Sequence, residues 1–189
     1  MLSTIHIEEI NAHDASRLSV LAKRAYSPHY AYLWLDGGKW YTETMYAADV
    51  LADEMTDPNV VYYIVSDDKE DLGYMKLKYD YPLSIGQGFS VGNGSGSQID
   101  APDALYLDRI YLTEQAVGKK IGTQLVNKSV AIAQQLGKTA IWLAAMDSSR
   151  AVEMYEKMGF MTCGSWRLDF ERLRPEYRGM FLMVKNLAQ

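Results

Sequence analysis

The chain has 189 residues, of which 48% are hydrophobic and 23% charged, a globular balance that excludes a largely disordered chain. Its net charge of -5 disfavours nucleic-acid binding, which needs clustered positive charge, and mildly favours cationic partners. The single cysteine, Cys163, excludes an intramolecular disulfide and suits a reducing compartment.

The length indicates one domain over residues 1–189. The segment from Met1 to Ile10 reaches Glu8 and Glu9 too early to provide the apolar run of a secretory signal. No stretch approaches the about 18 apolar residues of a membrane-spanning helix. We therefore expect a cytoplasmic protein that does not contact membranes.

The first half of the chain predicts a strand, two helices and two further strands. Period-2 alternation marks the first strand, and Asn11 or Asp14 can cap the helix that follows. That helix buries a face of Leu18, Leu21, Ala22 and Ala25 and is expected to end at Pro28. The remaining elements are a helix over 42–55 and strands over 60–66 and 72–79.

The second half predicts a strand over 104–112, a helix over 118–136, a strand over 139–145, a helix over 148–158 and strands over 160–170 and 179–184. A Gly- and Ser-rich segment over 84–100 reads as a flexible loop between strands. The element order β-α-α-β-β-β-α-β-α-β-β indicates an α/β class, a mixed sheet with helices on both faces.

The most informative stretch is a strand ending at Leu112, followed by a turn and then Gly118-Lys119-Lys120-Ile121-Gly122-Thr123. The unpaired N–H groups and the dipole at a helix N-terminus favour an anion, so this turn predicts a pyrophosphate site. An ordinary turn with two solvated lysines explains the stretch equally well. The spacing fits neither the nucleotide-triphosphate loop nor the dinucleotide fingerprint.

Downstream, a buried strand with Trp142-Leu143-Ala144-Ala145 precedes the run A-V-E-M-Y-E-K-M-G-F at 151–160. Together with the glycine turn, this order resembles the GCN5-related N-acetyltransferase (GNAT) family, and most closely its bacterial spermidine/spermine N-acetyltransferases. The resemblance is close over about 105–170 and follows the element order elsewhere.

The resemblance implies a splayed sheet that binds acetyl-CoA between the strands ending near Leu112 and Ala145. Backbone groups of the strand end would bond the pantetheine arm, and the amides of the turn would hold the pyrophosphate. The implied cofactor residues are Ile110, Tyr111, Leu112, Val117, Gly118, Lys119, Lys120, Ile121, Gly122 and Thr123, with Ser148 and Lys157 downstream.

Three of these positions depart from the family pattern. Val117 replaces a polar side chain, and Lys120 stands where the first family glycine stands. Ser148 replaces a common Asn, although its hydroxyl can still hydrogen-bond. Lys120 would either add charge to the phosphate site or obstruct the close approach that glycine permits.

The resemblance also implies roles in catalysis. Tyr155 occupies the position of the general acid toward the CoA sulfur; its alternative is a half-buried tyrosine bonded to a carbonyl. Asp108 occupies the position of a base for the amine proton, on the face opposite Leu107 and Arg109 by alternation; its alternative is an ion-pair partner. Lys157 would reach a cofactor phosphate or remain solvated.

An aromatic segment after the first helix, where the family builds its acceptor wall, suits an ammonium through cation–π contact. It contains His29, Tyr30, Tyr32, Trp34 and Asp36. Core packing explains these side chains equally well.

The sequence therefore predicts an acetyl-CoA-dependent N-acetyltransferase that acts on a small primary amine, such as a polyamine, by direct attack in a ternary complex. A protein N-terminus as acceptor stays open, and the family suggests a homodimer. The alternative is a CoA-binding regulatory module of the same fold without turnover. We expect no metal site, because His6, His13 and Cys163 have no other metal-ligating residue at the sequence spacing typical of a metal site.

Overall fold

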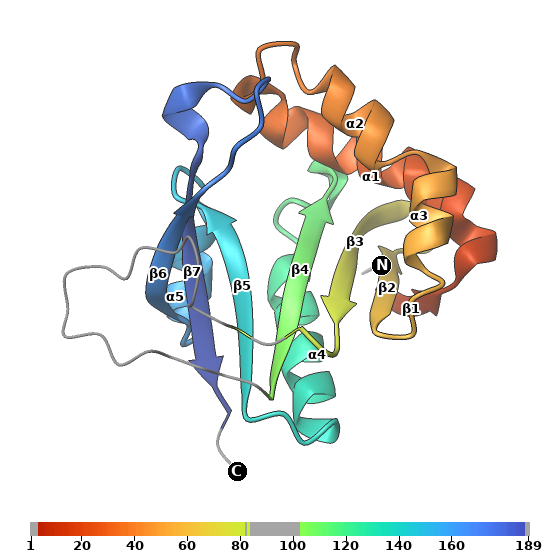
Figure 1. The fold of residues 1–189 in the computed structure, drawn as a ribbon. Coiled ribbons are helices and arrows are strands. Elements are labelled where there is room, and N and C mark those ends of the chain that lie inside the picture. The colour runs from red at the N-terminus through yellow and green to blue at the C-terminus, as the bar shows by residue number, and fades with distance from the viewer. Residues whose placement is uncertain (1–3, 82, 84–102, 188–189) are drawn as a thin grey trace. The chain divides into compact units, whose positions relative to one another are not determined.

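The computed structural model describes residues 4–81, 83 and 103–187, and the predicted loop over 84–100 lies outside them (Figure 1). The seven strands are hydrogen-bonded in the order β1-β2-β3-β4-β5-β7-β6. Their bounds are His6–Ile10, Val60–Ser66, Asp71–Lys78, Ala104–Leu112, Ala140–Met146, Met161–Arg167 and Gly179–Asn186 for β1 to β7. The helices are α1 (Ala15–Tyr30), α2 (Lys39–Met45), α3 (Ala48–Glu54), α4 (Ile121–Gln135) and α5 (Ala151–Lys157). The predicted mixed α/β class is confirmed.

The chain divides into two compact units. Two of the boundaries between them in the sequence fall within β4 and within α4. Unit 1 holds residues 1–78 and 108–127, and unit 2 holds residues 79–107 and 128–189. The prediction of one domain remains a prediction, and each unit is described by itself.

Unit 1 is an antiparallel arrangement of β1, β2 and β3, with α1, α2 and α3 beside it (Figure 1). The predicted apolar face of α1 is confirmed, because Leu18, Leu21, Ala22 and Ala25 are all buried. Strand β2 is apolar almost throughout, since Tyr62 to Val65 lie in the interior.

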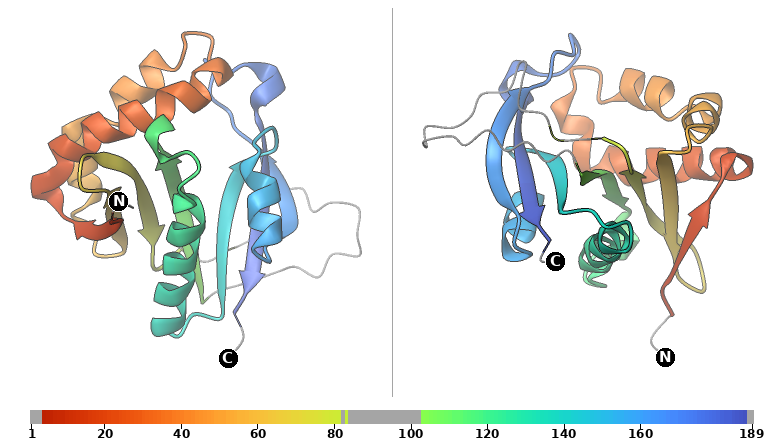
Figure 2. Two further views of the ribbon diagram at one scale, coloured as in Figure 1. Left: turned by 180° about the vertical axis from the view of Figure 1, so that it is seen from behind. Right: turned by 60° about the horizontal axis from the view of Figure 1, so that its bottom comes forward.

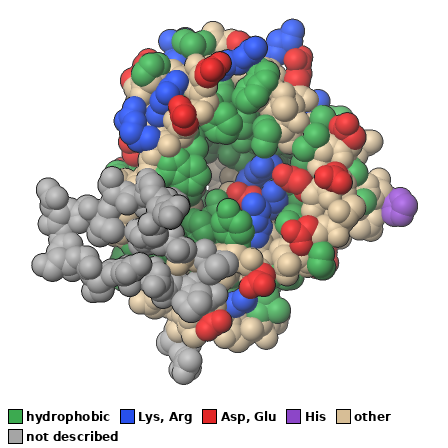
Figure 3. All heavy atoms as spheres, viewed as in Figure 1, with side chains coloured by type: hydrophobic (Ala, Val, Ile, Leu, Met, Phe, Trp, Pro, Cys, Tyr) green, Lys and Arg blue, Asp and Glu red, His purple; other side chains and the backbone are tan. Residues whose placement is uncertain are grey.

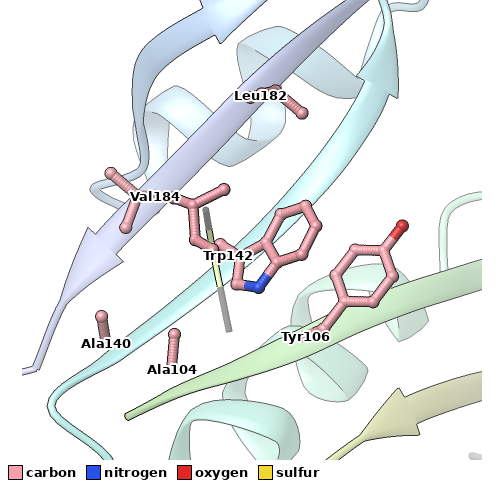
Figure 4. Close-up of a cluster of buried hydrophobic side chains, with 7 residues drawn as sticks. Ala104, Tyr106, Ala140, Trp142, Leu182 and Val184 are labelled. Carbon is pink, nitrogen blue, oxygen red and sulfur yellow. The ribbon is translucent and has the colours of Figure 1, made fainter. Parts of the chain in front are cut away.

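Unit 2 contains the start of β4, which runs parallel to β5, and the antiparallel strands β5, β7 and β6. Its core centres on Tyr106 and Trp142, whose rings stack with their centroids 3.9 Å apart (Figure 4). Ala104, Ala140, Leu182 and Val184 pack around this pair. Helix α5 lies over β5 when the molecule is seen from behind (Figure 2).

Several helix boundaries differ from the prediction: α5, for example, spans Ala151–Lys157 and not 148–158. At two of them packing overrides the local signals. The helix expected over 42–55 is two helices, α2 and α3, separated at Tyr46, which is fully buried among other tyrosines. Helix α1 continues past Pro28 to Tyr30, whose ring packs on Tyr26 with 5.0 Å between centroids. The end expected at Pro28 is therefore wrong.

Within the described part of the chain, every helix is too short or too polar to cross a lipid bilayer.

Candidate active site

The turn before α4 has the backbone shape that a phosphate cradle needs. Gly118 has a φ of 78° and Lys120 a φ of 54°, so two of three successive residues are left-handed. The helix begins at Ile121 and not at the predicted 118, because left-handed residues cannot be helical. Left-handed backbone costs a non-glycine residue about 1–2 kcal/mol, so Lys120 holds a conformation suited to the family's glycine.

The cradle is open at its glycine, because a side-chain carbon at Gly118 would meet no atom within 4 Å. The first N–H groups of α4, from Ile121 onward, have no partner inside the helix and stay available to an anion. Val117 and Lys120 are both exposed beside them. The turn is therefore open and exposed at Gly118, and the diphosphate site expected there remains a prediction.

One of the two lysines of the turn is already paired. The ammonium of Lys119 lies 2.9 Å from a carboxylate oxygen of Asp67, in the loop between β2 and β3. This hydrogen bond, with backbone N–H bonds from Lys69 and Glu70, lowers the pKa of Asp67 to about 2. The pair ties the turn to the neighbouring loop, so Lys120 is the more available of the two lysines for a phosphate.

The end of β4 is held by its neighbour β3. The backbone N–H of Thr113 donates to the carbonyl of Leu72 at 2.9 Å, and the Thr113 hydroxyl donates to the same oxygen. A side chain at Gly73 would overlap the Tyr111 carbonyl and Leu112. Close backbone approach at Gly73 therefore fixes the strand end, residues 110–112, that was predicted to bind the pantetheine.

Behind this strand end lies a cluster of charged side chains centred on Lys76, whose side chain is only 2% exposed. Its ammonium lies 2.9 Å from Glu54 and 3.1 Å from Asp108. Asp108 also lies 3.7 Å from the ammonium of Lys78, and Glu54 accepts the Tyr62 hydroxyl proton. Figure 3 shows basic side chains gathered over β3 and β4 with acidic side chains beside them.

These contacts set the protonation of the cluster. Burial alone would raise the pKa of Asp108, but Arg109, Lys76 and Lys78 outweigh it and hold that pKa below its ordinary value. Burial would also raise the pKa of Glu54, but the hydrogen bond from Tyr62 and the charges of Arg109 and Lys76 outweigh burial and lower that pKa. Burial and Arg109 lower the pKa of Lys76, partly offset by its two carboxylates. Asp108 is thus an ionised, weakly basic ion-pair partner at neutral pH.

Arg109 contacts the same part of unit 1 as Asp108, although alternation places the two on opposite faces. Its guanidinium carbon lies 5.6 Å from the centre of the Tyr46 ring. Tyr74 and Tyr46 act electrostatically on this guanidinium. Tyr74 in turn contacts Tyr111 at 5.7 Å, and Tyr111 lies edge-on to Tyr26 at 5.4 Å. The long arginine side chain reaches this aromatic cluster from β4.

The residues of the predicted acceptor wall are divided between core and surface. Trp34 is 2% exposed, and its indole N–H donates to the Tyr26 hydroxyl at 2.8 Å. Tyr30 is half-buried and lies edge-on to Tyr111 at 5.2 Å. His29 and Tyr32 are exposed. The carboxylate of Asp36 accepts the N–H groups of Gly38 and Trp40 before and within α2. Tyr30 therefore contacts Tyr111 directly, and Trp34 joins the same aromatic cluster through Tyr26 and Tyr41, on whose ring it stacks at 4.8 Å.

Three predicted residues lie in unit 2. Tyr155 is buried on α5, with its ring edge-on to Phe160 at 5.7 Å. Lys157 and Ser148 are exposed. The hydroxyl that accepts the N–H of Ala151 at the start of α5 belongs to Ser149, at 3.1 Å, which leaves the Ser148 side chain outside that cap.

Unit 2 also contains an open pocket of ≈ 490 Å³, lined by Asp147 and by residues 165–167 of β6 and 179–181 of β7. A side-chain carbon at Gly179 would overlap the carboxylate of Asp147, so this carboxylate, at the end of an exposed side chain, would have to move. The pocket thus presents one carboxylate, and Arg167 adds a guanidinium at its wall.

The sequence reasoning missed the residues that organise unit 1: Glu54, Lys76, Arg109 and Tyr46. A signal was present in β3, where alternation places Tyr74, Lys76 and Lys78 on one face of an otherwise apolar strand. Among the described residues, no group of three His, Cys, Asp or Glu side chains could hold a metal ion.

We expect Lys120→Gly to stabilise the protein. The substitution relieves about 1–2 kcal/mol of left-handed strain and costs about 0.5–1 kcal/mol through the larger entropy of the unfolded chain, so a net gain of up to about 1.5 kcal/mol follows. Urea unfolding measures it. Lys120→Ala removes the same ammonium but keeps the strain, so it should give no gain; equal stability of both variants would contradict the argument.

We expect Lys76→Met to cost about 3 kcal/mol at pH 7, because it leaves Glu54 and Asp108 without their shared ammonium. In the variant the pKa of each carboxylate rises, so the deficit should shrink when the pH falls from 7 to 5. Denaturant unfolding at both pH values measures this change. Lys78→Met, whose side chain is 26% exposed, is the control and should cost under about 1 kcal/mol.

Solved structures resemble the whole chain. A PaiA N-acetyltransferase from Thermoplasma acidophilum in complex with coenzyme A has a TM-score of 0.69 at 19% identity, covering 97% of this chain and 99% of that one. A spermidine N-acetyltransferase chimera from Vibrio cholerae has a TM-score of 0.65 at 18% identity, covering 96% and 95%. The ribosomal-protein-S18-alanine N-acetyltransferase from Escherichia coli has a TM-score of 0.66 at 12% identity, covering 98% and 96%. At these identities the likeness establishes the fold.

The family follows from the sequence itself. The model of the acetyltransferase (GNAT) family matches residues 21–160, well over half of the chain. This range includes the turn before α4, the end of β4 and Tyr155. The chain therefore belongs to the GNAT family and is an acetyltransferase that uses acetyl-CoA.

Proposed function

We propose that the protein transfers the acetyl group of acetyl-CoA to the primary amine of a small molecule. When bound, acetyl-CoA supplies the activated acetyl group as a thioester. The observation that carries the proposal is the turn before α4, where Gly118 and Lys120 are both left-handed and the amides of the helix start are open to an anion.

The backbone amides of residues 117–123 would hold the diphosphate, and Lys120 would add its charge. Val117, at 75% exposure, contributes no donor from its side chain. The strand end at residues 110–112 would hydrogen-bond the pantetheine arm, with Gly73 keeping it in place. Ser148 and Lys157 are exposed; by the family resemblance Lys157 would contact a cofactor phosphate and the Ser148 hydroxyl would form one hydrogen bond with the cofactor.

Tyr155 is proposed as the general acid that donates a proton to the leaving sulfur. A buried phenol releases its proton only when a strong base forms beside it, which suits a thiolate. The edge-on contact with Phe160 orients the ring.

The amine must lose a proton before it can attack, since a free primary amine has a pKa near 10.4. Asp108 is the residue that the family resemblance suggests as base. Its lowered pKa and its two ammonium partners favour the ion-pair role instead. We therefore propose that solvent removes the amine proton and that Asp108 positions Lys76.

A polyamine acceptor, a cytoplasmic location and a homodimer remain predictions. The first rests on the resemblance to spermidine/spermine acetyltransferases and on the net charge of -5. The second rests on the single cysteine, half-buried in β6. The third rests on the family alone.

The proposed function is tested by two measurements. Calorimetry with acetyl-CoA measures binding, and release of free thiol over a broad panel of primary amines measures transfer. We expect binding and release with at least one class of small amine. Binding without release from any amine would contradict the proposal.

We expect Tyr155→Phe to lower kcat about 100-fold, the usual scale of a lost general acid, with little change in acetyl-CoA affinity or thermal stability. The ring and its contact with Phe160 are kept. Tyr63→Phe, which loses a 3.1 Å hydrogen bond to Glu9, is the control and should keep full kcat. Equal activity of Tyr155→Phe and the wild type would remove Tyr155 from the chemistry.

If solvent removes the amine proton, kcat/KM should rise with pH up to the pKa of the acceptor itself. Two acceptors whose amines differ in pKa should then give profiles displaced by that difference. Asp108→Asn should lower kcat/KM at every pH but leave unchanged the pH at which the rising part of the profile levels off. If kcat/KM of Asp108→Asn no longer rose with pH, Asp108 would instead be identified as the base.

A further inference from the structure

Arg109 is a cation that the proposed chemistry does not use, and it carries an unmet hydrogen bond. Among the described residues, its Nη1 group is buried without any hydrogen-bond partner, and the buried hydroxyls of Tyr46 and Tyr74 have no partner other than each other. The guanidinium lies over the Tyr46 ring, and its charge acts on both tyrosines. Buried polar groups are almost always satisfied, so the unsatisfied guanidinium N–H beside two hydroxyls that contact no other polar group indicates a missing acceptor.

The charges around Arg109 leave it as the excess cation. Of the nearby carboxylates, Glu54 and Asp108 both contact the ammonium of Lys76, and Asp108 also lies near Lys78. Three cationic side chains thus face two carboxylates, and no described carboxylate forms an ion pair with Arg109. The local surplus is positive, although the chain as a whole is acidic.

The missing group has to accept hydrogen bonds. A guanidinium has five N–H donors and no acceptor, whereas a tyrosine hydroxyl can donate one proton. A carboxylate accepts from several donors at once and matches the fork of an arginine. An ammonium offers only donors, so it cannot satisfy Nη1 and would be repelled by the positive charge.

The walls around these donors are aromatic. Tyr26, Tyr30 and Tyr111 form a contiguous set of ring contacts at 5.0 to 5.4 Å between centroids. Tyr41 extends the set, stacked on Tyr26 at 5.0 Å. Such walls exclude water and strengthen an ionic contact with Arg109.

We propose that the acceptor is a primary amine that also carries a carboxylate, and that Arg109, with the hydroxyls of Tyr46 and Tyr74, binds this carboxylate. Arg109 is then a specificity-determining residue that selects amino acids or related amines over polyamines. The inference rests on the proposed function, because it names the acceptor class of the same site.

The test compares matched amines that differ only in the carboxylate. L-leucine, L-phenylalanine and L-methionine are each assayed beside isoamylamine, phenethylamine and 3-(methylthio)propylamine, with β-alanine, 4-aminobutyrate and spermidine as further acceptors. Thiol release gives kcat/KM for each. We expect at least one carboxylate-bearing amine to exceed its matched amine and spermidine by at least 10-fold.

Variants locate the effect. Arg109→Gln should raise KM for the carboxylate-bearing amine by 10-fold or more, leave the matched amine within 2-fold, and leave acetyl-CoA affinity unchanged. The Tyr46→Phe/Tyr74→Phe double variant keeps both rings and should raise the same KM 3- to 10-fold, which keeps the inference testable if Arg109→Gln fails to fold. Arg24→Gln, which removes a surface contact with Glu70, is the control and should change nothing.

Two results would overturn the inference: spermidine or the matched amines acting as well as their carboxylate-bearing partners, or Arg109→Gln lowering kcat/KM equally for both members of a pair. Absence of thiol release from every amine would contradict the proposed function instead. In that event calorimetric binding of each amine pair to wild type and to Arg109→Gln decides the inference on its own, with equal affinities overturning it.

Discussion

The bridge from Lys76 to Glu54 and Asp108 is the interaction on which the rest of unit 1 depends. It joins α3, β3 and β4 through one ammonium that is almost wholly removed from solvent. Removing any member would leave an uncompensated buried charge, which is far more costly than an exposed one. The bridge therefore holds β3 and β4 together beneath the tyrosines.

The same bridge decides what the carboxylates can do. Because Asp108 and Glu54 are occupied by Lys76, neither is free to attract a cationic acceptor, and the lowered pKa of Asp108 makes it a poor base. Arg109 is left as the surplus charge. A net charge of -5 for the whole chain suggested cationic partners, whereas the pairing of Lys76 and Lys78 with both carboxylates, which leaves Arg109 unpaired, suggests the opposite.

Periodicity predicted the framework well because burial produces it directly. Strands over 60–66 and 104–112 and the buried face of α1 are where alternation and helical spacing place them. The helix break at Tyr46 and the continuation past Pro28 could not be predicted, since Tyr46 packs on Tyr26 and Tyr30 packs on Tyr111, residues distant in sequence. The glycine turn was predictable from its family pattern, but the role of Lys119 was not, because Asp67 lies on another loop. Arg109 was missed because alternation says nothing of how far a long side chain reaches.

Lys120 illustrates how a binding turn is prepared before its ligand arrives. Its left-handed backbone belongs to the folded chain itself. The free-energy cost of this conformation is therefore compensated during folding, by the packing around the turn. A coenzyme that arrives and leaves with every turnover then meets amides already in position. The strain lowers the stability of the chain but slows no step of the cycle, and a residue that looks out of place by backbone preference can persist at such a corner.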